Sequence, residues 1–413
     1  MVITECQLYY YVLIINILAL FLFNILVFQN TYVIFVVIVQ NKMKQNKMKS
    51  KNIILLFTLA LPLFSCSESQ KRVSFSESTS AKSTALKEAF ISIPMDIKKK
   101  GDILYAGDFK GDSLLYCYSL SEQRFVNQML SQGQGPDEFL SPVEFFLSDS
   151  SAFIHNRWHF TAQNYTFNAK DFSIRRQGEL IHLPMSIDRV YPISESRFIA
   201  SGVFEDCRFL ILDNDGNVIS KSGDFPDYQS GEENIPNTAK GMFHQSQFGY
   251  NTDRKRLACA TSNVLELWDY KPETLTLHKR LLLAPYHYQF NSSPDGVYAE
   301  SDNPDAELGA RGIAVSNNYV YVLYNPNTNR MHEEQKETLN SEIWVFDWEG
   351  KPVRKILTDT HIECFCIDET DTSFYCVMTA PDYCIGNNRL MALLPPNKVG
   401  YRLPEDRRRR HQG

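Results

Sequence analysis

Short apolar segments separated by polar turns recur along most of this sequence. The clearest case is the stretch 343–353, IWVFDWEGKPV, in which an apolar run, a Glu-Gly turn and a returning run follow one another. Such runs, rich in aromatic and β-branched side chains, are typical of β-hairpins. The chain is therefore predicted to consist of repeated hairpins. Variants of the pattern occur at Leu115–Tyr118 with Phe125, Tyr165–Phe167 with Phe172, Phe209–Leu212 with Val218, and Leu265–Trp268 with Leu275.

The spacing of these hairpins predicts the architecture. Tyr118, Phe167 and Leu212 hold equivalent positions and follow one another at roughly 40–50 residues, the length of one propeller blade. The wider spacing further along the chain contains two insertions, 284–309 and 325–340. We therefore predict an all-β fold, a six-bladed β-propeller of four-stranded antiparallel blades, although five or seven blades would also fit the spacing.

The two ends of the repetitive region predict how the ring closes. Beyond Ile385 the sequence is rich in Pro, Arg and Asn and loses the strand pattern. Propellers hide the edge of one blade by pairing strands from both ends of the chain. The strand predicted near Leu86–Ile93 is therefore expected to close the sixth blade.

A basic stretch at 44–51, an apolar run at 53–64 and Cys66 follow one another near the N-terminus. This order is that of a secretory signal. The segment Leu63-Phe64-Ser65-Cys66 resembles the bacterial lipoprotein signal, in which the cysteine becomes the lipidated first residue. We therefore predict a signal peptide at 43–66, lipidation of Cys66, and a lipid-anchored location at the outer membrane, on its periplasmic or its surface side. A plain cleaved signal and an uncleaved anchor are the alternatives.

Composition predicts the remaining boundaries. Residues 1–42 are largely apolar and either form a transmembrane segment or precede the true start, which is expected at Met43 or Met48 because a complete signal begins there. Residues 67–85 are rich in Ser, Thr, Lys and Glu and are predicted to be a flexible tether. The propeller is expected over 86–385, and 386–413 is expected to be an irregular basic tail.

The formal charge of −6 understates how acidic the folded part is, because lysines at 42–51 and arginines at 407–410 lie near the chain ends. An acidic body repels phosphate backbones, so nucleic acid is not expected as a partner. No nucleophile elbow, phosphate loop or dinucleotide fingerprint occurs in the sequence. No cofactor is therefore expected.

Histidines and cysteines give no metal pattern. In an extended segment His155 and His159 would lie about 13 Å apart, too far for a shared zinc ion. The cysteines after position 66 include no Cys-x-x-Cys pair and are interpreted as buried free thiols, with one incidental disulfide left open.

Two loops are candidate binding elements. In the segment 133–139 glycine permits unusual backbone angles and proline fixes the chain direction, so the loop should have a defined shape. We interpret it first as structural, with Phe139 wedged between blades, and second as a channel loop formed by Gly133, Gly135, Pro136, Glu138 and Phe139. The insertion 284–309 carries aromatic side chains that would suit a sugar or protein partner, although their packing into a cap is an equal alternative. Its candidate binding residues are Tyr286, His287, Tyr288, Phe290 and Tyr298.

The segment 133–139 also resembles the glycine-rich stretch that leads into an NHL-type blade. Together with Arg311–Ala314, Tyr319–Tyr324 and the lipoprotein signal, it makes residues 66–385 similar to the six-bladed, TolB-like propeller lipoproteins of Bacteroidetes. The resemblance implies the fold. That family has no established common catalytic residues, so the resemblance assigns none here.

These observations favour a monomeric, non-enzymatic binding or scaffold protein that holds a protein or glycan partner at the cell envelope and contacts the membrane through its lipid. The alternative is a carbohydrate-active hydrolase or lyase, because propeller glycosidases assemble carboxylates from separate blades. Carboxylates or histidines from three or more blades at the channel mouth would favour the alternative. A channel of apolar and unpaired polar groups would favour binding.

Overall fold

The computed structural model describes residues 71–390 apart from 136–137, 149, 195, 294–295 and 380–381. The predictions made for the preface 1–42, the signal 43–66, Cys66, Pro136 and the tail beyond 390 lie outside the described residues.

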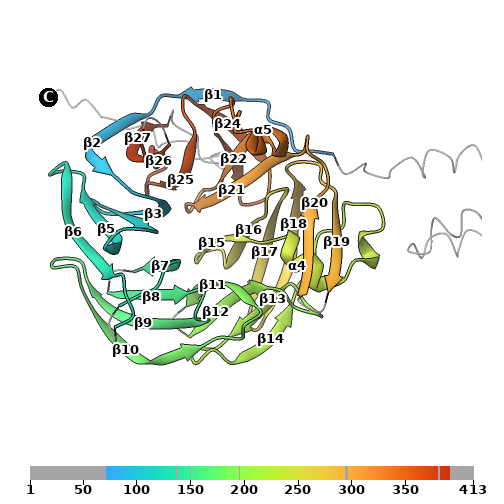
Figure 1. The fold of residues 1–413 in the computed structure, drawn as a ribbon, viewed down its shortest axis with the longest axis horizontal. Helices are drawn as coiled ribbons and strands as arrows, with labels where there is room; N and C mark the ends of the chain where they lie inside the picture. The colour runs from blue at the N-terminus through green and yellow to red at the C-terminus, as the bar shows by residue number, and fades with distance from the viewer. Residues whose placement is uncertain are drawn as a thin grey trace, which may run out of the picture. The chain divides into compact units, whose positions relative to one another are not determined.

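Six sheets, each with four antiparallel strands at its heart, form a ring (Figure 1). Blade 1 contains β3 (Pro94–Lys100), β4 (Ile103–Asp108), β5 (Ser113–Ser119) and β6 (Arg124–Ser131). Blade 2 contains β7 (Val143–Leu147), β8 (Ser151–Asn156), β9 (Thr161–Asn168) and β10 (Ser173–His182). Blade 3 contains β11 (Ile187–Ser194), β12 (Arg197–Gly202), β13 (Phe209–Leu212) and β14 (Val218–Ser222).

Blade 4 contains β15 (Gln247–Asn251), β16 (Arg256–Ala260), β17 (Val264–Lys271) and β18 (Thr274–Leu282). Blade 5 contains β21 (Glu307–Val315), β22 (Tyr319–Thr328), β23 (Glu342–Asp347) and β24 (Pro352–Thr358), with β1 (Ser78–Ala81) parallel to β24 at its outer edge. Blade 6 contains β25 (Ile362–Ile367), β26 (Ser373–Met378), β27 (Cys384–Arg389) and β2 (Thr84–Phe90). The predicted six-bladed propeller of four-stranded antiparallel blades is confirmed.

Chain ends close the ring as expected, but the sheets reach further than the predicted boundaries. Strand β2 pairs antiparallel with β27, with Ala85 opposite Gly386. Strand β1 and the start of β2 fall within the predicted tether 67–85, and β27 continues to Arg389, inside the predicted tail. These polar segments become strands because the outer edges of blades 5 and 6 offer unpaired N–H and C=O groups.

The core lies between blades. The hairpin 343–353 spans β23 and β24, and its residues Ile343 to Phe346 are all buried. Successive residues of a strand point to opposite faces of the blade, so both faces are buried here. On one side Trp344 and Phe346 join a cluster with Leu265 and Leu267 of blade 4. Both faces of a blade are covered by neighbouring blades, so a strand in the middle of a blade is apolar throughout.

Innermost strands β3, β7 and β11 were absent from the predicted strands. Their sequences mix charged and apolar residues, as in PMDIKKK of β3 and IDRVYPIS of β11. Each of these innermost strands has one edge that borders the central channel instead of another strand. Polar side chains are therefore tolerated in them. This mixture hides the strands from a search for apolar runs.

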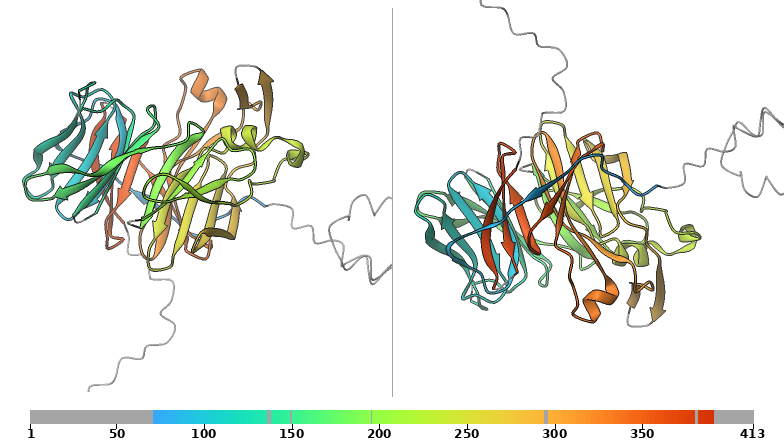
Figure 2. Two further views of the ribbon diagram at one scale, coloured as in Figure 1. Left: turned by 90° about the horizontal axis from the view of Figure 1, so that it is seen from below. Right: turned by 90° about the horizontal axis from the view of Figure 1, so that it is seen from above.

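Long connections gather on one face of the ring. In a blade of successive antiparallel strands, the link into the first strand and the link between the second and third lie on the same face. That face, the long-connection face, carries η2 (Glu232–Asn234) with α4 (Asn237–Phe243), the hairpin of β19 (Tyr288–Ser293) and β20 (Gly296–Ser301), and α5 (Asn329–Glu333). Figure 2 shows these additions projecting to one side. The other face carries tight turns such as 213–217, the predicted hairpin turn, where Asp213 accepts the Asn217 N–H at 2.8 Å.

No helix in the described portion of the chain has the length and hydropathy needed to cross a membrane.

Candidate functional site

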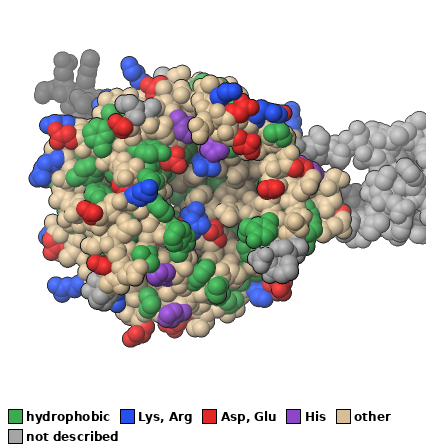
Figure 3. Space-filling view, in the orientation of Figure 1, with side chains coloured by type: hydrophobic (Ala, Val, Ile, Leu, Met, Phe, Trp, Pro, Cys, Tyr) green, Lys and Arg blue, Asp and Glu red, His purple; other side chains and the backbone are tan. Residues whose placement is uncertain are grey.

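The long-connection face has a hollow at its centre, and side chains of Lys, Arg, Asp and Glu gather in and around it (Figure 3). Innermost strands of the blades begin at this face, so charged residues near their starts meet at the mouth of the channel. A set of ion-paired residues from blades 1, 2 and 3 meets there, and we call it the channel-mouth cluster. It consists of Asp96, Lys98, Glu144, His155, Arg157, Asp188 and Arg189.

Glu144 on β7 is the centre of the cluster. One carboxylate oxygen forms a close ion pair with Arg189 of β11, and the other lies 3.0 Å from Nδ1 of His155 on β8. Asp188 forms a close ion pair with Arg157. Each of these carboxylates therefore has a cationic partner.

Lys98 joins blade 1 to the cluster. Its Nζ lies 2.9 Å from Asp96, donates to the Phe145 carbonyl at 2.5 Å and lies 4.4 Å from the centre of the Phe146 ring. All three carboxylates are thus neutralised by neighbouring cations.

The electrostatics keep Glu144 ionised. Burial by itself would raise the pKa of Glu144, but the charge of Arg189 and the His155 hydrogen bond outweigh it and lower the pKa to about 2. Burial would lower the pKa of Arg189, and the charges of Glu144 and Asp188 raise it instead. Glu144 therefore has no proton to donate near neutral pH. Nε2 of the fully buried His155 has no hydrogen-bond partner in the described structure.

Beside this cluster the described residues of the segment 133–142 (133–135 and 138–142), which we call the Gly133 loop, border an open depression of about 460 Å³. Oε2 of Glu138 accepts the Gly135 N–H at 2.7 Å, and the carboxylate lies so close over Gly133 that a side chain there would collide with it. Phe139 packs against the hydrophobic core between blades 1 and 2, with its ring 6.3 Å from that of Tyr165. The loop thus combines a structural wedge with an exposed polar rim.

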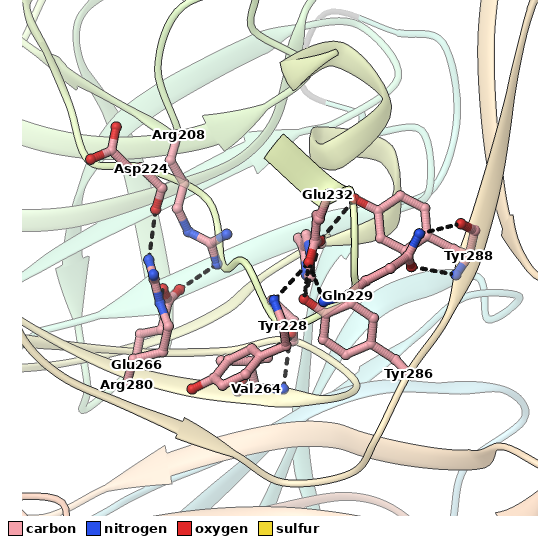
Figure 4. A network of polar contacts seen from close by, with 12 residues as sticks. Arg208, Asp224, Tyr228, Gln229, Glu232, Val264, Glu266, Arg280, Tyr286 and Tyr288 are labelled. Carbon is pink, nitrogen blue, oxygen red and sulfur yellow. Dashed lines mark hydrogen bonds and ion pairs between the residues drawn. The ribbon is translucent and has the colours of Figure 1, made fainter. Parts of the chain in front are cut away.

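The candidate residues of the insertion 284–309 divide into a pair bonded to Glu232 and an exposed group. Tyr286 and Tyr288 donate hydrogen bonds to the buried Glu232, which belongs to η2 (Figure 4). Phe290 and Tyr298 are 41 % and 55 % exposed, and they lie on opposite sides of the β19–β20 ribbon because Phe290 pairs with Ala299. The buried ring of Tyr288 and the half-buried ring of Tyr286 form a cap, the alternative that the sequence left open.

Glu232 holds this cap together. Its carboxylate also accepts backbone N–H groups of Tyr228 at 2.8 Å and Gln229 at 2.9 Å, and His244 Nε2 lies 3.2 Å away. Burial would raise the pKa of Glu232, but the hydrogen bonds from His244 and the backbone lower it to about 2. Burial and the Glu232 charge raise the pKa of Tyr286 and that of Tyr288. A charged carboxylate thus joins two insertions that are distant in sequence.

His287 is exposed and its Nδ1 lies 2.7 Å from Asp302 on the same ribbon. Among the described residues no group of three His, Cys, Asp or Glu side chains could hold a metal ion. The predicted free thiols are confirmed for every described cysteine, although Cys364 is only half-buried.

A family model described as "TolB-like 6-blade propeller-like" matches residues 74–370, most of the chain. The chain belongs to this family. No curated protein matches the sequence of this TolB-like propeller. Among solved structures, a protein provisionally described as exported, from Bacteroides fragilis, is 14 % identical with a TM-score of 0.50, covering 78 % of this chain and all of its own. A member of the duf4221 family from Bacteroides vulgatus is 11 % identical with a TM-score of 0.44, covering 78 % of this chain and 98 % of its own.

Sequence reasoning missed several residues of this TolB-like propeller that the structure brings together. Glu144 and Arg189 lie in strands that were not predicted, and Glu232 lies in a polar segment without a motif. The signal that was available is the pair His155 and His159, which flanks the turn beside the Gly133 loop. The sequence pattern of this histidine pair was weighed only as a metal site. Its actual significance is that it marks the turn that borders the depression.

Proposed function

We propose that this TolB-like propeller is a lipid-anchored envelope protein that binds a protein or glycan partner through its long-connection face. The observation that carries the proposal is the difference between the two faces of the ring. One face collects the insertions and the Gly133 loop, whereas the other has tight turns. Long loops on a rigid repeat scaffold are where binding residues concentrate.

The envelope location is supported by the signal pattern that ends at Cys66 and by the exported protein from Bacteroides fragilis that has a similar fold. The Cys66 thiol would carry the lipid, and the chain after it would lead to the propeller.

A hydrolase or lyase remains the second candidate because one specific observation favours it. The channel mouth does bring together Asp96, Glu144, His155 and Asp188 from three adjacent blades. A glycosidase, however, needs one carboxyl group that is protonated near neutral pH. The pKa of Glu144 is about 2, and Asp96 and Asp188 are ion-paired, so this arrangement favours binding over proton transfer.

The binding proposal predicts which face touches the partner in cells. A photo-crosslinking amino acid placed at Phe290, on the β19–β20 ribbon, should give adducts, because this side chain is 41 % exposed on the long-connection face. The same amino acid at Asp215, in the exposed turn 213–217 of the opposite face, should give none. Equal yields at the two positions would contradict the proposal, as would release of reducing sugar ends when envelope polysaccharide is incubated with the protein.

The anchor predicts a second result. Cys66→Ala should abolish incorporation of labelled palmitate and move the protein from the membrane pellet to the soluble fraction. Without the cysteine there are no acyl chains to hold the protein in the bilayer. Cys117→Ala, which alters a buried thiol of blade 1, is the matched control and should leave the fractionation unchanged. Wild-type fractionation of the Cys66 variant would show that the anchor is elsewhere.

A further inference from the structure

We propose that the depression beside the Gly133 loop is a subsite for a neutral saccharide, with Trp158 as the ring on which the sugar stacks. This proposal rests on the binding role proposed above and names its ligand class. The depression is lined by Gly133, Gln134, Gly135, Glu138, Leu140, Asn156 and His159. It lies between the connection that enters blade 2 and the β8–β9 turn, both on the long-connection face.

The rim of the depression has hydrogen-bonding groups that the protein itself does not use. Within the described structure the side chains of Gln134 and His159 make no hydrogen bond. Asn156 accepts the His159 N–H through Oδ1 at 3.3 Å, which leaves its Nδ2 free, and Glu138 uses only Oε2. Amide, imidazole and carboxylate groups together offer both donors and acceptors, as the vicinal hydroxyls of a sugar require.

The turn that carries Trp158 is held in place from both sides. Arg157 forms an ion pair with Asp188 of blade 3 and donates to its carbonyl at 3.2 Å. The Phe160 carbonyl accepts the Leu183 N–H at 2.8 Å. A binding group fixed before the ligand arrives loses less entropy on binding, so this turn suits a recognition element.

Trp158 at the tip of that turn is 66 % exposed. Its ring meets Phe109, of the β4–β5 turn in blade 1, with 6.5 Å between centroids and an interplanar angle of 80°. This edge contact fixes the ring orientation and leaves most of its surface in water. Aromatic side chains with one apolar and one wet side are characteristic of binding sites.

The residue types select the ligand class. Among the described residues that line the depression there is no Lys or Arg, whereas Glu138 is present, so sulfate, phosphate and uronate groups would meet a carboxylate without a lining cation. Leu140 is the one aliphatic side chain among the described lining residues, so an apolar peptide would bury little surface against them. A neutral pyranose combines an apolar C–H face for Trp158 with hydroxyls for the polar rim.

The test is a glycan array probed with the full chain in detergent. It displays neutral oligosaccharides, uronate-containing oligosaccharides and sulfated oligosaccharides beside a set of unglycosylated peptides. We expect binding to members of the neutral set. Trp158→Ala should weaken that binding at least tenfold, and Gln134→Ala should weaken it by a smaller factor. Phe90→Ala is the matched control, because it removes another exposed aromatic ring, on the outer strand β2 of blade 6 and far in sequence from the depression, and it should leave binding unchanged.

The outcomes separate the proposals. Trp158 and Gln134 are exposed, so thermal unfolding should confirm that both variants fold as the wild type does. Binding only to anionic glycans or to peptides, binding that survives Trp158→Ala, or no binding on the array would overturn the saccharide subsite. Cleavage of a bound neutral sugar would instead overturn the non-enzymatic function and leave the subsite standing.

Discussion

Replacement of Glu266 by leucine should lower the free energy of unfolding by about 3–5 kcal/mol, because it leaves a buried guanidinium without a counter-charge. Glu266 is fully buried on β17, and Arg208 beside it is 1 % exposed. Their ion pair measures 2.6 Å, and Arg280 forms a second one at 2.6 Å with the other carboxylate oxygen. Burial would lower the pKa of Arg208, but the Glu266 charge raises it, so Arg208 keeps its charge when folded.

The size of the effect depends on which partner is removed. Arg208→Met should cost less than Glu266→Leu, because Glu266 retains Arg280 (Figure 4). The double variant Arg208→Met/Glu266→Leu should recover part of the loss, since no buried charge remains at either position. Calorimetry should show a fall in Tm of roughly 10 °C for Glu266→Leu.

An exposed ion pair provides the control for this experiment. Lys221 and Asp206 lie 2.8 Å apart with more than half of each side chain exposed, so Lys221→Met should leave Tm unchanged. If the double variant were as unstable as Glu266→Leu alone, the loss would come from packing and the explanation by an unpaired charge would be wrong.

Glu232→Gln should destabilise the cap by about 2–4 kcal/mol, since hydrogen bonds to a charged group are strong and an amide cannot accept all of the donors present. The donors include Tyr286, Tyr288 and two backbone N–H groups. Hydrogen exchange should accelerate in α4 and in the β19–β20 ribbon, while the central strands of blade 4 keep their protection.

The same carboxylate predicts a pH dependence. The pKa of Glu232 is lowered from 4.5 to about 2 in the folded protein. The ionised carboxylate therefore makes its full contribution to the free energy of unfolding at every pH above its ordinary pKa. That contribution is lost as pH falls from about 5 toward 2, because the unfolded chain takes up the proton first. The Glu232→Gln variant has no carboxyl group to titrate at this position, so this part of the loss of stability in acid should be missing. Glu233→Gln, a change at the exposed neighbour, should preserve both the stability and the pH profile. Equal effects of the two substitutions would rule out a special role for Glu232.

The candidate site was only partly visible in the sequence. The Gly133 loop attracted attention because glycine and proline have local conformational meaning, and Phe139 does pack between blades as expected. Trp158 was not selected, since an isolated tryptophan has no periodicity. Its importance comes from position, in a turn that borders the same depression as the Gly133 loop.

The aromatic insertion shows the opposite case. Tyr286, Tyr288, Phe290 and Tyr298 are alike in sequence, yet two are fastened to Glu232 and two are exposed. No local pattern distinguishes them, because the carboxylate that accepts hydrogen bonds from the first pair is more than fifty residues away in the chain.

By itself the sequence predicted the repeated hairpins, a propeller ring of about six blades and the strand that closes it. Those features depend on the alternation of apolar runs and turns, which acts over a few residues and repeats at the length of a blade. Only the tertiary structure decided which polar residues meet, including Glu144 with Arg189 and Glu266 with Arg208. The reason is physical: ring closure brings strands of separate blades side by side, at the channel mouth for the first pair and between blades 3 and 4 for the second, and the pairing of charges depends on distances that sequence spacing does not encode.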